Sequence, residues 1–84
     1  MERNYVVYLI ECVDHTFYCG ITNNIGRRLK EHNKGIASKY TRGRIPVMLL
    51  GNSQQMSKSE ALKLEYKVKQ LPKFEKLAKV RSKR

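Results

Sequence analysis

The chain has 84 residues, 40% of them hydrophobic, which is enough for one small folded domain and too hydrophobic for a disordered chain. It carries 18 lysines and arginines against 7 acidic residues, a formal net charge of +11. Such a surface favours a polyanionic partner, nucleic acid before an anionic membrane. Because the sequence contains no run of about 18 apolar residues, we expect no membrane-spanning helix.

The opening residues and the cysteines bear on compartment and metal chemistry. The start, MERNYVVY, has a short apolar run mixed with polar residues, unlike a secretory signal peptide, so we expect a cytoplasmic protein. In that compartment Cys12 and Cys19 are expected to stay reduced. Together with His15 and His32 they lack the paired spacing of a zinc site, so zinc is not expected.

The first elements along the chain form a predicted hairpin. Val, Ile, Leu and Tyr dominate residues 5–13, which predicts a strand, and residues 17–22 predict a second strand. Asp14, His15 and Thr16 between them are typical of a turn.

The register of this hairpin decides whether Tyr8 and Tyr18 share a face of the sheet. If Val13 pairs with Thr16 around a two-residue turn, the tyrosines lie on opposite faces, because side chains alternate along a strand. If Val13 pairs with Phe17 around a three-residue turn, both tyrosines lie on one face. Two-residue turns favour Asn-Gly or Asp-Gly, and the Asp-His found here lacks the glycine. We therefore predict an odd-length loop, or an equivalent bulge, with both hydroxyl groups on one side.

A helix is predicted over residues 25–33, capped by Asn23 or Asn24 and stopped by Gly35. Residues 36–45 are predicted to be a basic loop.

On a helical wheel, Ile25 and Leu29 define the apolar side of this helix, and Arg28 and His32 lie beside them. Arg27 points away. The wheel leaves two interpretations of Arg28: its stem covers the edge of the core while the charge stays in water, or the guanidinium belongs to a site.

A third short strand is predicted at residues 47–51, opened by a proline. Ser57 or Ser59 begins the longest helix, which continues to Leu71, and Ser57 with Glu60 matches a capping box.

A proline at position 72 ends that helix, and a last short helix is predicted over residues 73–80, before a basic tail ending RSKR. The predicted fold is therefore α+β, one domain over residues 1–84 in the order β-β-α-β-α-α, with a small three-stranded antiparallel sheet flanked by helices.

Two further groups of residues each allow two interpretations. Glu65 flanks the apolar stripe of the long helix, where it either pairs with Lys69 one turn on or ligates a metal ion. The loop over residues 36–45 is either a solvated surface or a contact for phosphates and bases. Its charged and aromatic residues are Lys39, Tyr40, Arg42 and Arg44.

Two short segments, taken with the helices that follow them, resemble the GIY-YIG nuclease family. VYL, residues 7–9, stands where the family has GIY, and YCG, residues 18–20, stands where it has YIG. NNIGRRLKEH resembles the family's arginine-bearing helix, and ALKLEYKVKQL resembles the helix with its metal-binding glutamate. The resemblance covers nearly the whole chain and is closest to small stand-alone bacterial members. The first motif lacks its Gly and Ile, and we expect no separate DNA-recognition domain in the chain.

The resemblance implies a site made of five side chains, which are Tyr8, Tyr18, Arg28, His32 and Glu65. By this resemblance Glu65 would bind Mg²⁺ or Mn²⁺, Arg28 would contact phosphate, a tyrosine would help activate water and His32 would assist proton transfer. The implied activity is metal-dependent hydrolysis of phosphodiester bonds in DNA, and the alternative is a catalytically weak module that binds DNA or RNA. The residues expected to contact the nucleic acid outside the site are Arg27, Lys39, Tyr40, Arg42 and Arg44.

Overall fold

The computed structural model describes residues 3–81. Its elements are β1 (Val6–Glu11), β2 (Phe17–Thr22), α1 (Ile25–Asn33), α2 (Lys39–Arg42), β3 (Met48–Asn52), α3 (Lys58–Lys69) and α4 (Lys73–Arg81). The predicted α+β class and the predicted order of strands and main helices are confirmed. The basic tail beyond residue 81 lies outside the described residues.

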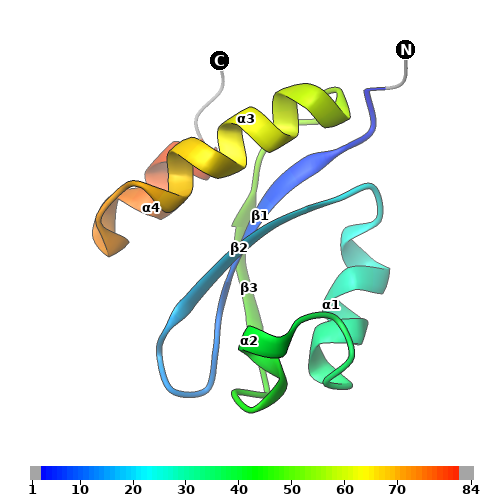
Figure 1. Cartoon of the computed structure of the whole chain (residues 1–84), viewed down its shortest axis with the longest axis vertical. Helices are drawn as coiled ribbons and strands as arrows, with labels where there is room; N and C mark the ends of the chain where they lie inside the picture. The colour runs from blue at the N-terminus through cyan, green and yellow to red at the C-terminus, as the bar shows by residue number, and fades with distance from the viewer. Residues whose placement is uncertain (1–2, 82–84) are drawn as a thin grey trace.

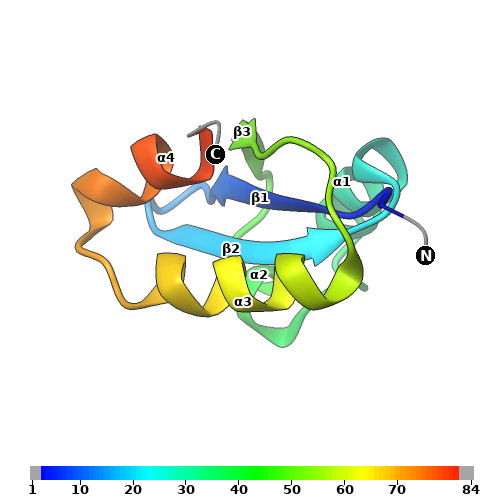
Figure 2. The same cartoon turned by 90° about the horizontal axis from the view of Figure 1, so that it is seen from above.

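The sheet is antiparallel with the strand order β2-β1-β3, so β1 lies in the centre. All residues of β1 from Val6 to Ile10 are buried, because helices cover both of its faces. Figure 1 shows α3 and α4 on one side of the strands and α1 and α2 on the other. In the view from above, the fainter α2 lies behind α3, farther from the viewer (Figure 2).

Alternation along the strands divides the core in two. Val7, Leu9 and Cys19 point to the α3 and α4 side, where they pack with Ala61 and Val68. The opposite face of the sheet carries the second cluster, which joins the sheet to α1. Its members are Tyr8, Ile10, Cys12 and Val47, with Tyr18, Ile25, Leu29 and Leu49 packed around them.

The hairpin has the predicted odd loop, but the predicted pairing of Val13 with Phe17 is wrong. The backbone N–H of Cys12 donates to the carbonyl of Thr16 at 2.8 Å, so the loop consists of the three residues 13–15. The reason is that His15 adopts a left-handed backbone with φ of 69°, which closes a three-residue turn one position earlier than expected. The ladder pairs Tyr8 with Gly20 and Tyr18 with Ile10, and both tyrosines therefore share a face.

The segment over residues 36–45 is not simply a loop, because it contains the four-residue helix α2. The side chain of Ser38 accepts a hydrogen bond from the N–H of Tyr40 and caps this helix. Thr41 is fully buried, so one side of the turn points into the protein. The sequence prediction missed this helix because its composition is strongly basic and it is only one turn long.

The other helix ends follow the predicted capping. Asn24 accepts from the N–H of Arg27 at the start of α1, and Gly35, with φ of 77°, follows its end. Ser57 and Glu60 form the predicted capping box of α3. The first strand is shorter than predicted at both ends, because Tyr5 bridges to Met56 outside the ladder and the strand ends at Glu11, before the hairpin loop.

Candidate active site

A buried chain of hydrogen bonds joins the sheet to α1 and α2. The hydroxyl of Tyr8 lies 2.8 Å from Nε2 of His32, and Nδ1 of His32 lies 2.8 Å from Oγ1 of Thr41. Tyr8 is 2% exposed, His32 1% and Thr41 0%, so these groups bond to one another rather than to bulk water. A buried polar group without such partners would be costly, and here each has one.

The direction of these bonds follows from the single hydroxyl proton of Thr41. That hydroxyl donates to the carbonyl of Ser38 at 3.4 Å, so it accepts a hydrogen bond from Nδ1 of His32. With the proton on Nδ1, the Nε2 atom has a free lone pair, and we assign Tyr8 as the donor to it. The arrangement therefore orients a neutral imidazole as a proton acceptor for a tyrosine.

Burial keeps both groups neutral at physiological pH. Loss of water around His32 lowers its pKa, and the nearby Arg28 guanidinium lowers it further. Burial also raises the pKa of Tyr8 far above its usual value, with Tyr18 adding to the rise and Arg28 opposing it. Tyr8 is consequently a phenol and His32 an imidazole in the resting protein.

Tyr18 and Tyr40 continue the site toward solvent. The Tyr18 ring centroid lies 6.5 Å from that of Tyr8 and 5.2 Å from that of His32. Tyr40 of α2 stacks on Tyr18 with the centroids 5.8 Å apart, and the Arg44 guanidinium lies 4.2 Å from the Tyr40 centroid. Tyr18 is only partly buried, so a ligand in solution can contact it.

Arg28 and Arg27 differ as the helical wheel predicts. The Arg28 side chain is 33% exposed and the Arg27 side chain 58%. Only Arg28 acts electrostatically on both Tyr8 and His32. Its Nη1 atom donates to Glu31 at 3.2 Å, while its Nε atom is buried with no hydrogen-bond partner among the described residues. The guanidinium therefore keeps an unused donor at Nε.

Glu65 lies on α3, which packs on the Cys19 face of the sheet, opposite the face that carries Tyr8 and Tyr18. Its side chain is 19% exposed and lies 3.2 Å from Nζ of Lys69, so the predicted ion pair is present. Burial raises the pKa of Cys19, and the negative charge of Glu65 adds to that rise, whereas for Tyr8 the charge of Glu65 is the smallest of several effects.

The donor set around Glu65 suits a magnesium ion better than zinc. Among residues 3–81 no three His, Cys, Asp or Glu side chains gather as a metal-binding cluster. Mg²⁺ is commonly held by one or two carboxylates with water in the other positions, so a half-buried Glu65 fits it. Burial raises the pKa of the Cys19 thiol to about 11, so the metal-free protein carries this thiol in its protonated form.

A cleft of about 270 Å³ opens beside Tyr18. Its walls are largely apolar, and two lysines, Lys69 and Lys76, line it as well. The remaining lining residues are Leu9, Phe17, Cys19 and Tyr40. A pocket with aromatic walls and cationic groups suits a nucleotide, which presents a flat base and an anionic phosphate. No pattern in the sequence pointed to Lys76 or Thr41, which reach the site only through the folding of α4 and α2.

The residues predicted to bind nucleic acid outside the site have different surroundings. Lys39 and Arg42 are exposed on α2, and Arg27 is exposed on α1. Tyr40 is 39% exposed. Arg44 is engaged within the protein, because its Nε donates to Asp14 at 3.0 Å and its Nη1 to the carbonyl of Tyr40 at 2.7 Å. Arg44 therefore positions Tyr40 rather than offering a free cation.

The comparisons with known proteins agree on one family. The family model described as the GIY-YIG catalytic domain matches residues 4–78. The chain is similar to a UPF0213 protein of Halobacterium salinarum, with 51% identity over 72 residues, 86% of this chain and 94% of that protein. It is also similar to a UPF0213 protein of Oceanobacillus iheyensis, with 47% identity over 77 residues, 92% and 90% of the two chains.

A solved structure shares the fold. The solution NMR structure of the UPF0213 protein BH0048 from Bacillus halodurans is 42% identical, with a TM-score of 0.52. The similarity covers 86% of this chain and 77% of that one. Among residues 3–81, moreover, we find no helix with the length and apolar character needed to cross a membrane.

Proposed function

Because the chain belongs to the GIY-YIG catalytic domain family, we propose that it is a metal-dependent endonuclease that hydrolyses phosphodiester bonds in DNA. The observation that carries this proposal is the buried hydrogen bond of 2.8 Å between the Tyr8 hydroxyl and Nε2 of His32. Phosphodiester hydrolysis needs a base that removes a proton from water, and a tyrosine bonded to a neutral histidine supplies one.

In the proposed step, the Tyr8 oxygen accepts a proton from the attacking water while the Tyr8 proton moves to Nε2 of His32. Tyr8 thus stays a phenol throughout, which matters because burial makes its phenolate form unfavourable. Because burial lowers its pKa, His32 is neutral in the resting protein and its Nε2 lone pair is free for the proton, although the same burial makes it a weaker base than an exposed histidine. Thr41 holds the imidazole in the required tautomer.

Tyr18 and Arg28, the more accessible members of the site, are the groups we assign to the phosphate. A guanidinium donates to two phosphate oxygens at once and remains charged at any physiological pH. Mg²⁺ or Mn²⁺ held by Glu65 would neutralise phosphate charge and stabilise the leaving oxygen. Lys69, Lys76 and the cleft beside Tyr18 are suited to the flanking nucleotide.

A second candidate function, a nucleic-acid-binding module that cuts poorly, is favoured by two ion pairs. Arg28 bonds to Glu31 and Glu65 bonds to Lys69, each at 3.2 Å. Glu31 and Lys69 therefore compete with the phosphate and the metal ion for Arg28 and Glu65. These pairs are partly exposed, however, and such pairs contribute only about 0–1 kcal/mol, so a phosphate or a divalent cation competes with them readily.

The test is cleavage of supercoiled, branched and single-stranded DNA, with Mg²⁺ and with a chelator. Tyr8→Phe keeps the ring and removes the proton path, so we expect cleavage to fall about 10²- to 10⁴-fold while DNA binding is retained. Tyr5→Phe is the matched control, because Tyr5 lies next to β1 but outside the site. Wild-type protein that binds these DNAs and cuts none of them would establish the binding module instead.

A further inference from the structure

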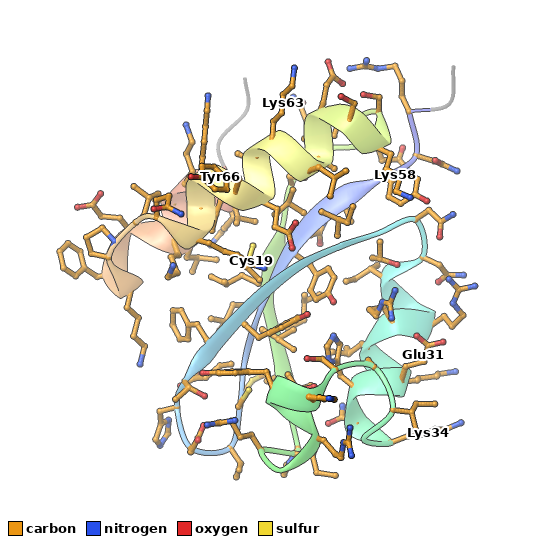
Figure 3. The ribbon with its side chains drawn as sticks, viewed as in Figure 1. Cys19, Glu31, Lys34, Lys58, Lys63 and Tyr66 are labelled. Atoms are coloured by element: carbon orange, nitrogen blue, oxygen red, sulfur yellow. The ribbon has the colours of Figure 1, made fainter. Side chains whose placement is uncertain are left out.

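The outer surface of α3 and α4 carries two large aromatic side chains that join no core. Phe74 is 83% exposed and Tyr66 67%. Both line one groove of about 690 Å³, together with Leu71 and Ala78. Figure 3 shows Tyr66 on the outer side of α3, directed away from the strands. Exposed aromatic side chains that gather in one groove, rather than scattering singly, indicate a binding surface.

Lysines surround this groove. Lys67 and Lys79 line it, and the same two lysines line a neighbouring cavity of about 380 Å³ that Lys63 also lines. Within residues 3–81, none of these three lysines has a carboxylate within 4 Å, whereas the Arg3 of the same cavity pairs with Glu60. Their charges are therefore available to an anionic ligand.

This surface is separate from the candidate active site. Ala61 and Val68 mark the buried side of α3, and Glu65 lies next to that side. Tyr66 follows Glu65 by one residue, a rotation of about 100° around the helix axis, which turns it toward solvent. Lys63 and Tyr66 both extend from the outer side of the helix (Figure 3).

We propose that this aromatic–lysine surface, made of Tyr66, Phe74, Lys63, Lys67 and Lys79, is a second nucleic-acid site that binds single strands. Bases stack on the two rings, and phosphates contact the three lysines. Aromatic rings with flanking cations are the combination that binds unpaired strands without sequence preference, because every base has a flat face. A duplex does not expose those faces, so the site is selective for single strands.

Charge and composition disfavour other occupants. A second copy of this chain would bring the same lysines together on proteins that each carry a net charge of +11. A protein partner needs an apolar centre that becomes fully buried. The aliphatic lining of this groove is limited to Leu71 and Ala78, and Glu75 also lines it. An acidic protein is therefore the weaker candidate, and the experiment below separates it from nucleic acid.

The experiment measures binding of a fluorescent oligothymidylate of about 12 nucleotides to the full chain, with a chelator present so that cleavage does not interfere. We expect Tyr66→Ala and Phe74→Ala each to weaken binding about 5- to 100-fold, the effect of losing one base–aromatic stack. Tyr66→Phe keeps the ring and should bind as the wild type does. Leu62→Ala is the matched control, since Leu62 is 47% exposed on the same helix and does not line the groove.

An abasic strand of the same length isolates the stacking. It offers the same phosphates without bases, so Tyr66→Ala should not change its affinity, while Lys67→Ala should weaken both strands. In the wild-type protein, the ring signals of Tyr66 and Phe74 should move upfield in NMR spectra when oligothymidylate is added. Unmoved ring signals, or an oligothymidylate affinity within about twofold of wild type in the Tyr66→Ala and Phe74→Ala double variant, would overturn the proposal and leave the groove to a protein.

This proposal does not depend on cleavage. Tyr8→Phe should abolish cutting and leave oligothymidylate binding at the α3 and α4 surface unchanged. Loss of the second site and loss of the nuclease activity are therefore observed in different variants.

Discussion

A Cβ atom on Gly20 would lie 2.6 Å from the hydroxyl oxygen of Tyr8 and 2.9 Å from its Cζ. Gly20 and Tyr8 are direct partners in the hairpin, so the glycine leaves the space that the tyrosine fills. The glycine of the YCG segment is thus a packing requirement of the Tyr8–His32 hydrogen bond. It allows the hydroxyl to lie flat against β2 and reach the histidine.

Gly20→Ala should therefore displace Tyr8 from His32. Overpacking of this kind costs about 1–3 kcal/mol of folding stability, and the lost hydrogen bond should reduce cleavage as Tyr8→Phe does. Urea unfolding and a cleavage assay measure the two effects. In a Tyr8→Phe background the clash is partly relieved, so the stability cost of Gly20→Ala should be smaller. An equal cost in both backgrounds would mean that the hydroxyl is not held against Gly20.

Arg28→Ala should lose cleavage activity far more than Arg27→Ala. Arg28 is the less exposed of the two and acts on both Tyr8 and His32, whereas Arg27 extends into solvent. Arg28→Lys should recover little, because an ammonium group lacks the planar fork that contacts two phosphate oxygens. The measurement is the cleavage rate at saturating DNA. Equal losses in the two alanine variants would show that α1 does not direct Arg28 to the substrate.

Glu65→Gln should abolish metal-dependent cleavage and leave DNA binding largely intact, because it removes the proposed ligand but not the basic surface. Lys69→Met is the matched variant, since it breaks the same ion pair and keeps the carboxylate. Because Lys69 also lines the cleft beside Tyr18, we expect Lys69→Met to bind DNA more weakly but to keep metal-dependent cleavage at saturating DNA and high Mg²⁺, and both variants to lose little stability. If the two variants lose cleavage activity equally at every Mg²⁺ concentration, Glu65 acts through its ion pair with Lys69 and not as a metal ligand.

The buried imidazole of His32 should make folding stability depend on pH. The pKa of His32 in the folded protein lies below the usual 6.5 that it has in the unfolded chain. At pH values between the two, the unfolded chain therefore binds more protons than the folded protein does. The stability that the neutral His32 contributes is fully present above about pH 6.5, and it is lost as the pH falls below that value. Melting temperatures between about pH 7.5 and pH 5.5 measure it. His32→Gln should flatten the dependence, whereas His15→Asn, a change at an exposed position that tolerates positive φ, should preserve it.

DNA binding should weaken steeply with salt and depend little on sequence. Counterion release makes the logarithm of the affinity fall linearly with the logarithm of the salt concentration, with a slope of about −0.9 per phosphate neutralised. Lys39→Ala, on exposed α2, should reduce the slope by about one. Arg44→Ala should act differently, since Arg44 holds Tyr40 and Asp14. A flat salt response with one preferred sequence would contradict a backbone-directed mode of binding.

Local patterns in the sequence were sufficient for the three strands, for the helices other than α2, and for which residues share a face. Strand alternation has a period of two, so any odd loop between residues 12 and 17 places Tyr8 and Tyr18 together, even though the predicted partner residues were off by one step. The wheel of α1 likewise distinguishes Arg28 from Arg27, because the helix repeat depends only on spacing. Caps at Asn24 and Ser57 follow from side chains that bond to nearby backbone groups.

Tertiary structure decided how these residues meet and how deeply they are buried. The Tyr8–His32 bond spans 24 positions and the Tyr18–Tyr40 stack spans 22, because α1 and α2 fold back over one face of the sheet. Burial then keeps Tyr8 and His32 neutral, an effect of water exclusion that no spacing in the sequence reveals. Thr41 enters the site for the same reason, since only the closed fold brings α2 against His32.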